Sequence, residues 1–279
     1  MRRLGVHTSI AGGLDKSVER ARALGCNTFQ VFSHNPRGWA VKERSQEECA
    51  AFRKLRHDFD ISPAFIHTSY LINLAATDKV LLKKSVDMVT GELNTADALG
   101  AEYVVLHTGS ASGDDPGNAR RRAIRCLTEV AEAGKWKAGL LLENTAGERG
   151  DITSRIAEIA EIIDAVPRGL IAGICIDTCH AFAAGYDLKS DSGIDVLAAE
   201  IERYAGRESL RLVHLNDARG DVGSHLDRHD HIGGGKLGIE ALRAIVNHPS
   251  FRNVPLILET PKKTEEDDPR NLALVKGLF

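Results

Sequence analysis

The segment YVVLHTG, residues 103–109, shows how this chain is organised, because four apolar residues run directly into a His-Thr pair and a glycine. A short run that is rich in β-branched residues and is bounded by a turn-forming residue is typical of a buried strand in a parallel sheet. Runs of this kind recur along the whole chain, and with the first they make eight. The other seven are LGVHTS (4–9), TFQVFS (28–33), PAFIHTS (63–69), GLLLENT (139–145), AGICIDT (172–178), RLVHLND (211–217) and VPLILET (254–260).

Amphipathic segments lie between these runs, and several of them end at glycine or are followed by proline, as helix ends require. Eight strand-helix units without a glycine-rich linker favour a closed (β/α)8 TIM barrel over an open, doubly wound α/β sheet. The 279 residues, 43% of them hydrophobic, suit one such domain over residues 1–279. The clearest helical segments are residues 17–25, 86–100, 119–133, 154–166 and 238–247.

The composition narrows the class of protein. The 36 basic and 39 acidic residues give no general attraction to nucleic acid or to anionic membranes. The five cysteines are scattered and form no CxxC pair, which argues against a disulfide framework and favours a reducing cytosol. No signal-peptide pattern and no run of about 18 apolar residues occurs, so we expect a cytoplasmic protein without a membrane partner. No GxGxxG or Walker motif follows a strand, which removes the main support for nucleotide binding.

Each apolar run ends in a polar residue, and in a barrel the carboxyl ends of all strands face one mouth, where active sites are built. Six of these residues are predicted metal ligands, and three more come from DTCH (177–180) and SHLDRHDHIG (224–233). The six are His67, His107, Glu143, Asp177, His214 and Glu259. Nine ligands are too many for one ion and suit three ions that share a bridging carboxylate. Five imidazoles and four carboxylates without a thiolate favour zinc, with manganese or iron as alternatives. The strand-end residues are His7, Ser33, His67, His107, Glu143, Asp177, His214 and Glu259, and the added ligands are His180, Asp227 and His229.

For other residues near the predicted ligands, and for the remaining histidines, the sequence predicts roles other than metal binding. Asp227 and His229 are two residues apart in an extended segment and should project to the same side, whereas Arg228 should point away toward a phosphate or a carboxylate. His7 either supports the site or packs in the core. We expect Cys175 and Cys179 to be buried structural thiols. The histidines expected on the surface or in solvated loops are His34, His57, His225, His231 and His248.

Four long motifs resemble endonuclease IV, the zinc-dependent apurinic/apyrimidinic (AP) endonucleases of AP endonuclease family 2. They are HTSYLINLA (67–75), LLENTAG (141–147), DTCHAFAAGYD (177–187) and HLND (214–217) followed by GSHLDRHDHIGGGKLG (223–238). The likeness covers essentially the whole chain and implies a xylose-isomerase-like TIM barrel with three zinc ions. It assigns His67, His107 and Glu143 to the first ion, the bridging Glu143 with Asp177, His214 and Glu259 to the second, and His180, Asp227 and His229 to the third.

The resemblance also implies an activity. Such an enzyme hydrolyses the phosphodiester bond 5′ to abasic sites in duplex DNA, removes 3′-blocking groups, and acts as a monomer on the nucleoid in base excision repair. Glu143 would bridge two ions and orient the attacking hydroxide. By the same resemblance, Arg37, Tyr70 and Leu71 would enter the duplex at the lesion, and Asn35 would contact its backbone. Tyr70 and Leu71 could instead pack onto the following helix.

One loop departs from the family pattern, and two other classes of protein stay open. Residues 148–151 read Glu-Arg-Gly-Asp where the family commonly has a glutamine-glycine pair, which leaves this loop without a predicted DNA contact. A sugar-isomerase-like barrel also binds divalent metals at its strand ends, but it needs fewer ligands and does not account for His180, Asp227 and His229. A non-catalytic sensor of metal or damaged DNA would bind zinc without turnover.

Overall fold

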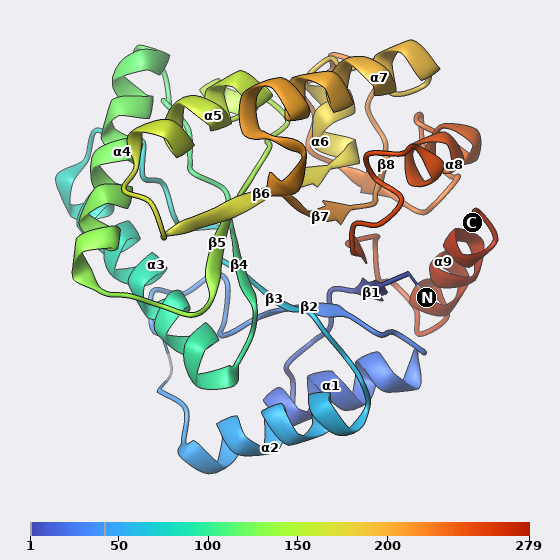
Figure 1. The fold of residues 1–279 in the computed structure, drawn as a ribbon, viewed down its shortest axis with the longest axis horizontal. Coiled ribbons are helices and arrows are strands. Elements are labelled where there is room, and N and C mark those ends of the chain that lie inside the picture. Colours follow the sequence, from blue (N-terminus) through green and yellow to red (C-terminus); the bar gives the residue numbers. More distant parts are fainter. Residues whose placement is uncertain (1, 42) are drawn as a thin grey trace.

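The structure, a computed structural model, describes residues 2–41 and 43–279. Eight parallel strands form one sheet in the order β1-β10-β7-β6-β5-β4-β3-β2 (Figure 1). Its two outer strands also meet, since the backbone N–H of Thr8 donates to the carbonyl of Gln30 over 2.7 Å. The predicted barrel is therefore confirmed as a nearly closed one. The strands are β1 (Leu4–Val6), β2 (Phe29–Phe32), β3 (Ala64–His67), β4 (Tyr103–Leu106), β5 (Gly139–Glu143), β6 (Ile171–Asp177), β7 (Leu210–His214) and β10 (Leu256–Leu258).

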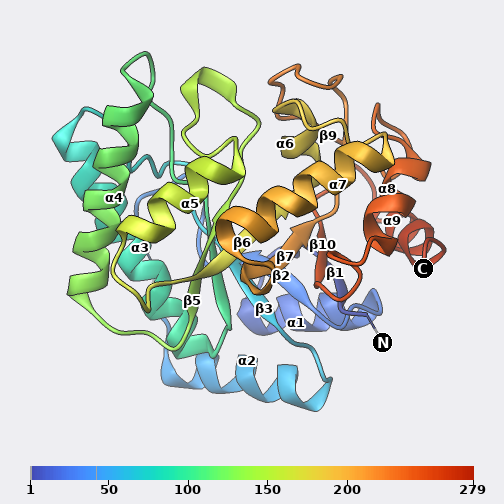
Figure 2. The ribbon, with the colours of Figure 1, turned by 45° about the horizontal axis from the view of Figure 1, so that its top comes forward.

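Helices surround the sheet and pack their apolar faces against it (Figures 1 and 2). Local chemistry sets their ends. The Asp78 carboxylate caps the longest helix by accepting from the N–H groups of Val80 and Leu81, and Gly100 ends it with a φ of 64°. The α-helices of the described residues are α1 (Leu14–Ala23), α2 (Gln46–Asp58), α3 (Lys79–Leu99), α4 (Pro116–Ala133), α5 (Ile156–Ala165), α6 (Thr178–Ala183), α7 (Asp191–Glu200), α8 (Ile239–Asn247) and α9 (Asp267–Lys276).

The core has two layers, because successive residues of a strand point to opposite faces. The larger layer lies between the barrel and the helices. The smaller layer fills the inside of the barrel with one side chain from each of six strands and forms a solid floor beneath the mouth. Its members are Phe65, Val105, Leu141, Cys175, Leu212 and Ile257.

A short antiparallel hairpin rises from the mouth after β7 and carries the histidine-rich segment. It consists of β8 (Asp217–Ala218) and β9 (His229–Asp230). The Asp217 carboxylate accepts hydrogen bonds from the backbone N–H groups of Gly235, Leu237 and Gly238. A Cβ at Gly235 would lie 2.5 Å from Asp217 Oδ1, so only glycine lets the chain turn this closely behind the hairpin. Within the described residues, no helix combines the length and the apolar character needed to cross a membrane.

Candidate metal centre

The nine predicted ligands meet at the carboxyl ends of the strands, around the buried carboxylate of Glu143. The two oxygens of this carboxylate face different neighbours. Oε2 lies 2.9 Å from His107 Nε2 and 3.3 Å from His67 Nε2. Oε1 lies 2.9 Å from His214 Nδ1. The two oxygens of Glu143 thus face two separate sets of imidazoles, an arrangement compatible with the predicted bridging role.

The second group is built on neighbouring strands. Asp177 and His214 end β6 and β7 in register with each other, and Glu259 directly follows β10. Glu259 Oε2 lies 3.4 Å from His214 Nδ1, and Asp177 Oδ2 lies 4.0 Å from the same nitrogen. With Glu143, these residues bring four potential ligand atoms within 4.8 Å of one another.

The third group joins helix α6 to the hairpin. Asp177 Oδ1 accepts from the backbone N–H of His180 over 2.9 Å and so starts the helix that carries His180. Asp227 Oδ1 lies 3.1 Å from His180 Nε2 and 3.6 Å from His229 Nε2. Asp227 and His229 thus point to the same side, while the exposed Arg228 turns its guanidinium back to the carbonyl of Asp227.

Hydrogen bonds orient the imidazoles as metal ligands require. The Nδ1 atoms of His67, His180 and His229 face backbone carbonyls at 2.8, 3.0 and 3.1 Å, which leaves Nε2 of each ring directed into the cluster. The Nε2 atom of His229 is buried and has no hydrogen-bond partner. An orphaned nitrogen beside two carboxylates fits a cation, and the donor set of imidazole and carboxylate fits zinc.

The cluster shifts the acid-base behaviour of its members. Burial opposes ionisation of Glu143, yet the nearby His214 and His107 hold the pKa of this carboxyl well below its ordinary value. Burial likewise disfavours a charged His180, but the carboxylates of Asp177 and Asp227 raise the pKa of its imidazole well above 6.5. The residues therefore form a dense set of opposite charges, as expected where metal ions bind.

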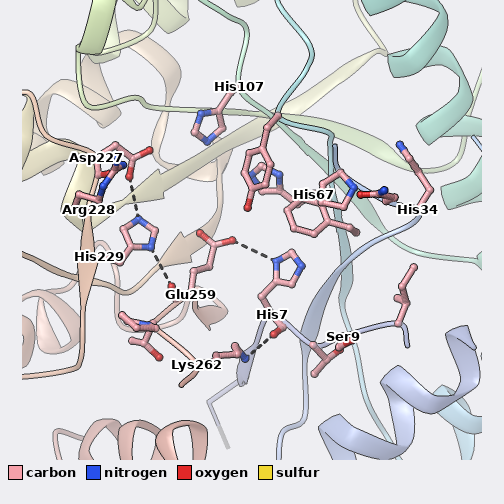
Figure 3. A pocket seen from close by; sticks show the side chains of 18 of the residues that line it. His7, Ser9, His34, His67, His107, Asp227, Arg228, His229, Glu259 and Lys262 are labelled. Carbon is pink, nitrogen blue, oxygen red and sulfur yellow. Dashed lines mark hydrogen bonds and ion pairs between the residues drawn. The ribbon is translucent and has the colours of Figure 1, made fainter. Parts of the chain in front are cut away.

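A cavity of about 850 Å³ opens over the three groups. Figure 3 shows Asp227 and His229 on the left of the cavity, His107 at the top, His67 on the right and Glu259 near the centre. Lys262 lies at its rim and donates to the carbonyl of His7 over 2.7 Å. The mouth thus combines the ligand cluster with a lysine at its edge.

The predicted DNA-binding residues lie on two loops beside the cavity. Asn35 and Tyr70 line it, and Arg37 is exposed on the same loop as Asn35. The hydroxyl of Ser69 donates to the carbonyl of Pro36 over 2.7 Å and ties the two loops together. Tyr70 keeps 69% of its surface exposed, which leaves its ring free for a partner, whereas Leu71 is partly buried.

The structure confirms the prediction for Cys175 and Cys179 and contradicts the one for His34. Cys175 and Cys179 are buried as predicted, and burial raises the pKa of both thiols, that of Cys175 to about 12, which disfavours the thiolate form that binds metals. The prediction of a surface His34 is wrong. This residue is 6% exposed, and its Nδ1 lies 3.2 Å from the buried carboxylate of Glu92 on α3, which no local pattern around residue 34 indicates.

The sequence pattern does not predict several residues that support the cluster. Asn144 and Asn216 hold Asp177: Asn144 Oδ1 accepts from its backbone N–H, and Asn216 Nδ2 donates to Oδ2, both over 2.7 Å. Both follow predicted strand ends closely, in LLENT and HLND, which is the signal that could have found them. Gln30 contacts His214 and Glu259. It lies inside the apolar run TFQVF of β2, and a single amide in such a run is the signal that could have found it.

The unusual loop at residues 148–151 has a structural role. Glu148 Oε1 accepts a hydrogen bond from the backbone N–H of Asp227 over 2.9 Å. Beside it, Gly147 adopts a φ of 82°, and a Cβ there would lie 2.7 Å from Nδ1 of His225. The loop therefore packs against the segment that carries the third group and fixes its backbone.

Comparisons with known proteins show which family the chain belongs to. The family whose model matches residues 18–278 is described as a xylose isomerase-like TIM barrel. The protein named probable endonuclease 4 in Methanoculleus marisnigri is 43% identical over 276 residues, which cover 99% of this chain and 98% of the relative. The corresponding protein of Cenarchaeum symbiosum is 39% identical over 277 residues, covering 99% of both chains.

Solved structures give the same result. Endonuclease IV from Thermus thermophilus has a TM-score of 0.86 at 39% identity, with 99% of this chain and 98% of that chain covered. A D-tagatose 3-epimerase-like protein, with a TM-score of 0.72 at 18% identity over 98% of this chain and 96% of its own, shares the fold alone. The chain belongs to the endonuclease IV family of xylose isomerase-like TIM barrels.

Proposed function

We propose that this protein is a zinc-dependent AP endonuclease that hydrolyses the phosphodiester bond 5′ to an abasic site in duplex DNA. The products would be a 3′-hydroxyl and a 5′-deoxyribose phosphate, and 3′-blocking groups would be removed at the same site. The observation that carries the proposal is the bridging arrangement of Glu143 between two ligand groups, with a third group beside them. The full-length relatives named endonuclease 4 support it.

The ligand groups explain how an acidic chain attracts DNA. Four carboxylates in the cluster would face three divalent ions, which leaves a local excess of about two positive charges. Ions held there would lower the pKa of a water toward about 7 and neutralise charge on the phosphate oxygens. This local field acts at the mouth although the chain as a whole has a formal charge of −3. Its ligand carboxylates are Glu143, Asp177, Asp227 and Glu259.

The protein's own residues supply orientation and access. Glu143 would orient the attacking water, a role supported by its full burial and by the imidazoles that face both of its oxygens. The exposed ring of Tyr70 packs edge-on against Phe32 at 5.1 Å and is free to replace the stacking that the lesion has lost. Arg37 and Leu71 would enter the duplex beside it, and Asn35 would contact the backbone. An abasic sugar lacks base stacking, so moving it into the cavity costs less than flipping an intact nucleotide.

We further propose that the enzyme works as a monomer, on the DNA of the nucleoid in the cytoplasm, in base excision repair. All nine predicted ligands come from the described residues of one chain, which supports a site that takes no residue from a second copy. Outside the mouth, binding should rest on individual arginine and lysine contacts and should weaken as salt rises.

The decisive experiment is incision of a duplex oligonucleotide that carries one tetrahydrofuran abasic analogue. This analogue cannot undergo β-elimination, so a cut reports hydrolysis alone. The protein is assayed as purified, after prolonged chelation, and after zinc is returned. We expect a cut 5′ to the analogue that fades on chelation and recovers with zinc. A folded, zinc-loaded protein that leaves the strand intact would refute the proposal; sugar isomerisation or plain DNA binding would then be tested.

A further inference from the structure

Gln30 lies at the centre of a hydrogen-bond network beneath the second ligand group. It is fully buried on β2, the strand that closes the barrel against β1. Its Oε1 lies 2.8 Å from His214 Nε2. Its Nε2 lies 2.6 Å from Glu259 Oε1 and 3.0 Å from His7 Nδ1. The amide thus contacts two predicted ligands of the same ion, one through each of its ends.

The partners allow only one orientation of this amide. A carboxylate oxygen can only accept, so the amide atom that faces Glu259 must be the NH2 group. The opposite end, which faces His214 Nε2, is then the carbonyl oxygen, and His214 must carry a proton on Nε2. The remaining amide hydrogen is directed at His7 Nδ1, which accepts it. Both amide hydrogens and the carbonyl oxygen of Gln30 then have a hydrogen-bond partner.

This orientation of the amide leaves Nδ1 of His214 and Oε2 of Glu259 available to bind the ion. A neutral imidazole protonated on Nε2 has its lone pair on Nδ1, and Nδ1 of His214 faces Glu143 Oε1 at 2.9 Å inside the cluster. Glu259 engages Gln30 through Oε1, so its Oε2, 3.4 Å from His214 Nδ1, remains available. A reversed amide would place its oxygen against the Glu259 carboxylate and would favour the His214 tautomer that cannot bind through Nδ1.

We propose that Gln30 is a positioning residue for the second metal ion, which sets the tautomer of His214 and the rotamer of Glu259 through the two ends of one amide. The inference rests on the proposed zinc centre. Outer hydrogen-bond partners of this kind change metal affinity about 10- to 100-fold when they are lost. Gln30 contacts two ligands of one ion, so its loss should weaken one zinc site selectively.

The test uses the full chain with two variants and one control. Gln30→Met keeps an unbranched side chain of similar volume but makes no hydrogen bond. Gln30→Glu keeps an oxygen that accepts from His214 but loses both donors. The control Thr28→Val removes a buried hydroxyl that directly precedes β2 and donates to the carbonyl of Pro63. Bound zinc per chain is measured across a series of zinc-buffered solutions, and the Nε2 proton of His214 is followed by NMR in the zinc-loaded proteins.

We expect wild type and Thr28→Val to hold all their zinc at a free concentration where Gln30→Met has lost one ion, with an affinity for that ion about 10- to 100-fold weaker. The Nε2 proton of His214 should exchange with water as slowly in Gln30→Glu as in wild type, and faster in Gln30→Met, where it has lost its acceptor. Wild-type zinc affinity in Gln30→Met, or faster exchange of this proton in Gln30→Glu, would overturn the proposal for Gln30 alone. A wild-type protein that binds no zinc would overturn the metal centre as well.

Discussion

The loop that carries Asn35 and Arg37 is anchored by a buried carboxylate far from it in the sequence. Glu92 on α3 is 0% exposed and accepts a hydrogen bond from the hydroxyl of Ser33, with His34 Nδ1 3.2 Å from its other oxygen. These two residues begin the loop. The free energy of unfolding of the protein should therefore depend on pH through Glu92.

The expected size of the effect follows from the pKa of Glu92. Burial, opposed by the Ser33 hydroxyl and by the charges of His67 and Arg44, raises the pKa of this carboxyl from 4.5 to about 7. The folded chain thus binds the proton more tightly than the unfolded chain does. The associated stability is fully present below pH 4.5 and is lost as pH rises through about 7. The total loss is about 3 kcal/mol, of which about 2.5 kcal/mol falls between pH 5 and pH 8.

Glu92→Gln tests this reasoning, because the amide can still accept from Ser33 but cannot ionise. We expect the free energy of unfolding of Glu92→Gln, relative to wild type, to rise by about 2.5 kcal/mol between pH 5 and pH 8. Urea denaturation of the zinc-loaded proteins measures it, and Glu132→Gln, an exposed site on α4, is the control. An equal difference between Glu92→Gln and wild type at both pH values would refute the burial argument.

Four further predictions concern the site. Glu143→Gln should keep the fold and lose about 10²- to 10⁴-fold in kcat on the tetrahydrofuran duplex; activity within a few-fold of wild type would end its bridging role. Glu148→Leu, which removes the acceptor for the backbone N–H of Asp227, should weaken one zinc site about tenfold in equilibrium dialysis, whereas Glu148→Gln should bind as wild type does. Tyr70→Ala should raise KM for the abasic duplex about tenfold in steady-state kinetics, and an unchanged KM would leave its exposed ring without this role. Zinc should bind the chelated protein more tightly as pH rises, because carboxylates hold the pKa of His180 well above 6.5 and its proton must leave first. Calorimetry in two buffers would detect this proton release, and its absence would contradict the assignment of His180 as a ligand.

The sequence by itself determined the strand-helix order and the set of polar side chains that meet at the mouth. Apolar runs that end in His67, Glu143 or Asp177 predict both a strand and the side chain at its carboxyl end, and a parallel barrel must bring such ends to one mouth. The same alternation placed Asp227 and His229 on one side of an extended segment. These features follow from residues adjacent in the chain, so local pattern was sufficient.

Only the tertiary structure decided what supports those ligands. Gln30 meets Glu259 because β2 closes the barrel, and Glu148 meets the Asp227 backbone because two loops pack together. The burial of His34 depends likewise on Glu92, which lies 58 residues further along the chain. Hydrogen bonds between distant segments depend on packing, which a one-dimensional pattern does not encode. A sequence therefore shows which groups reach the mouth, whereas their tautomers, rotamers and charge states are set by the folded chain.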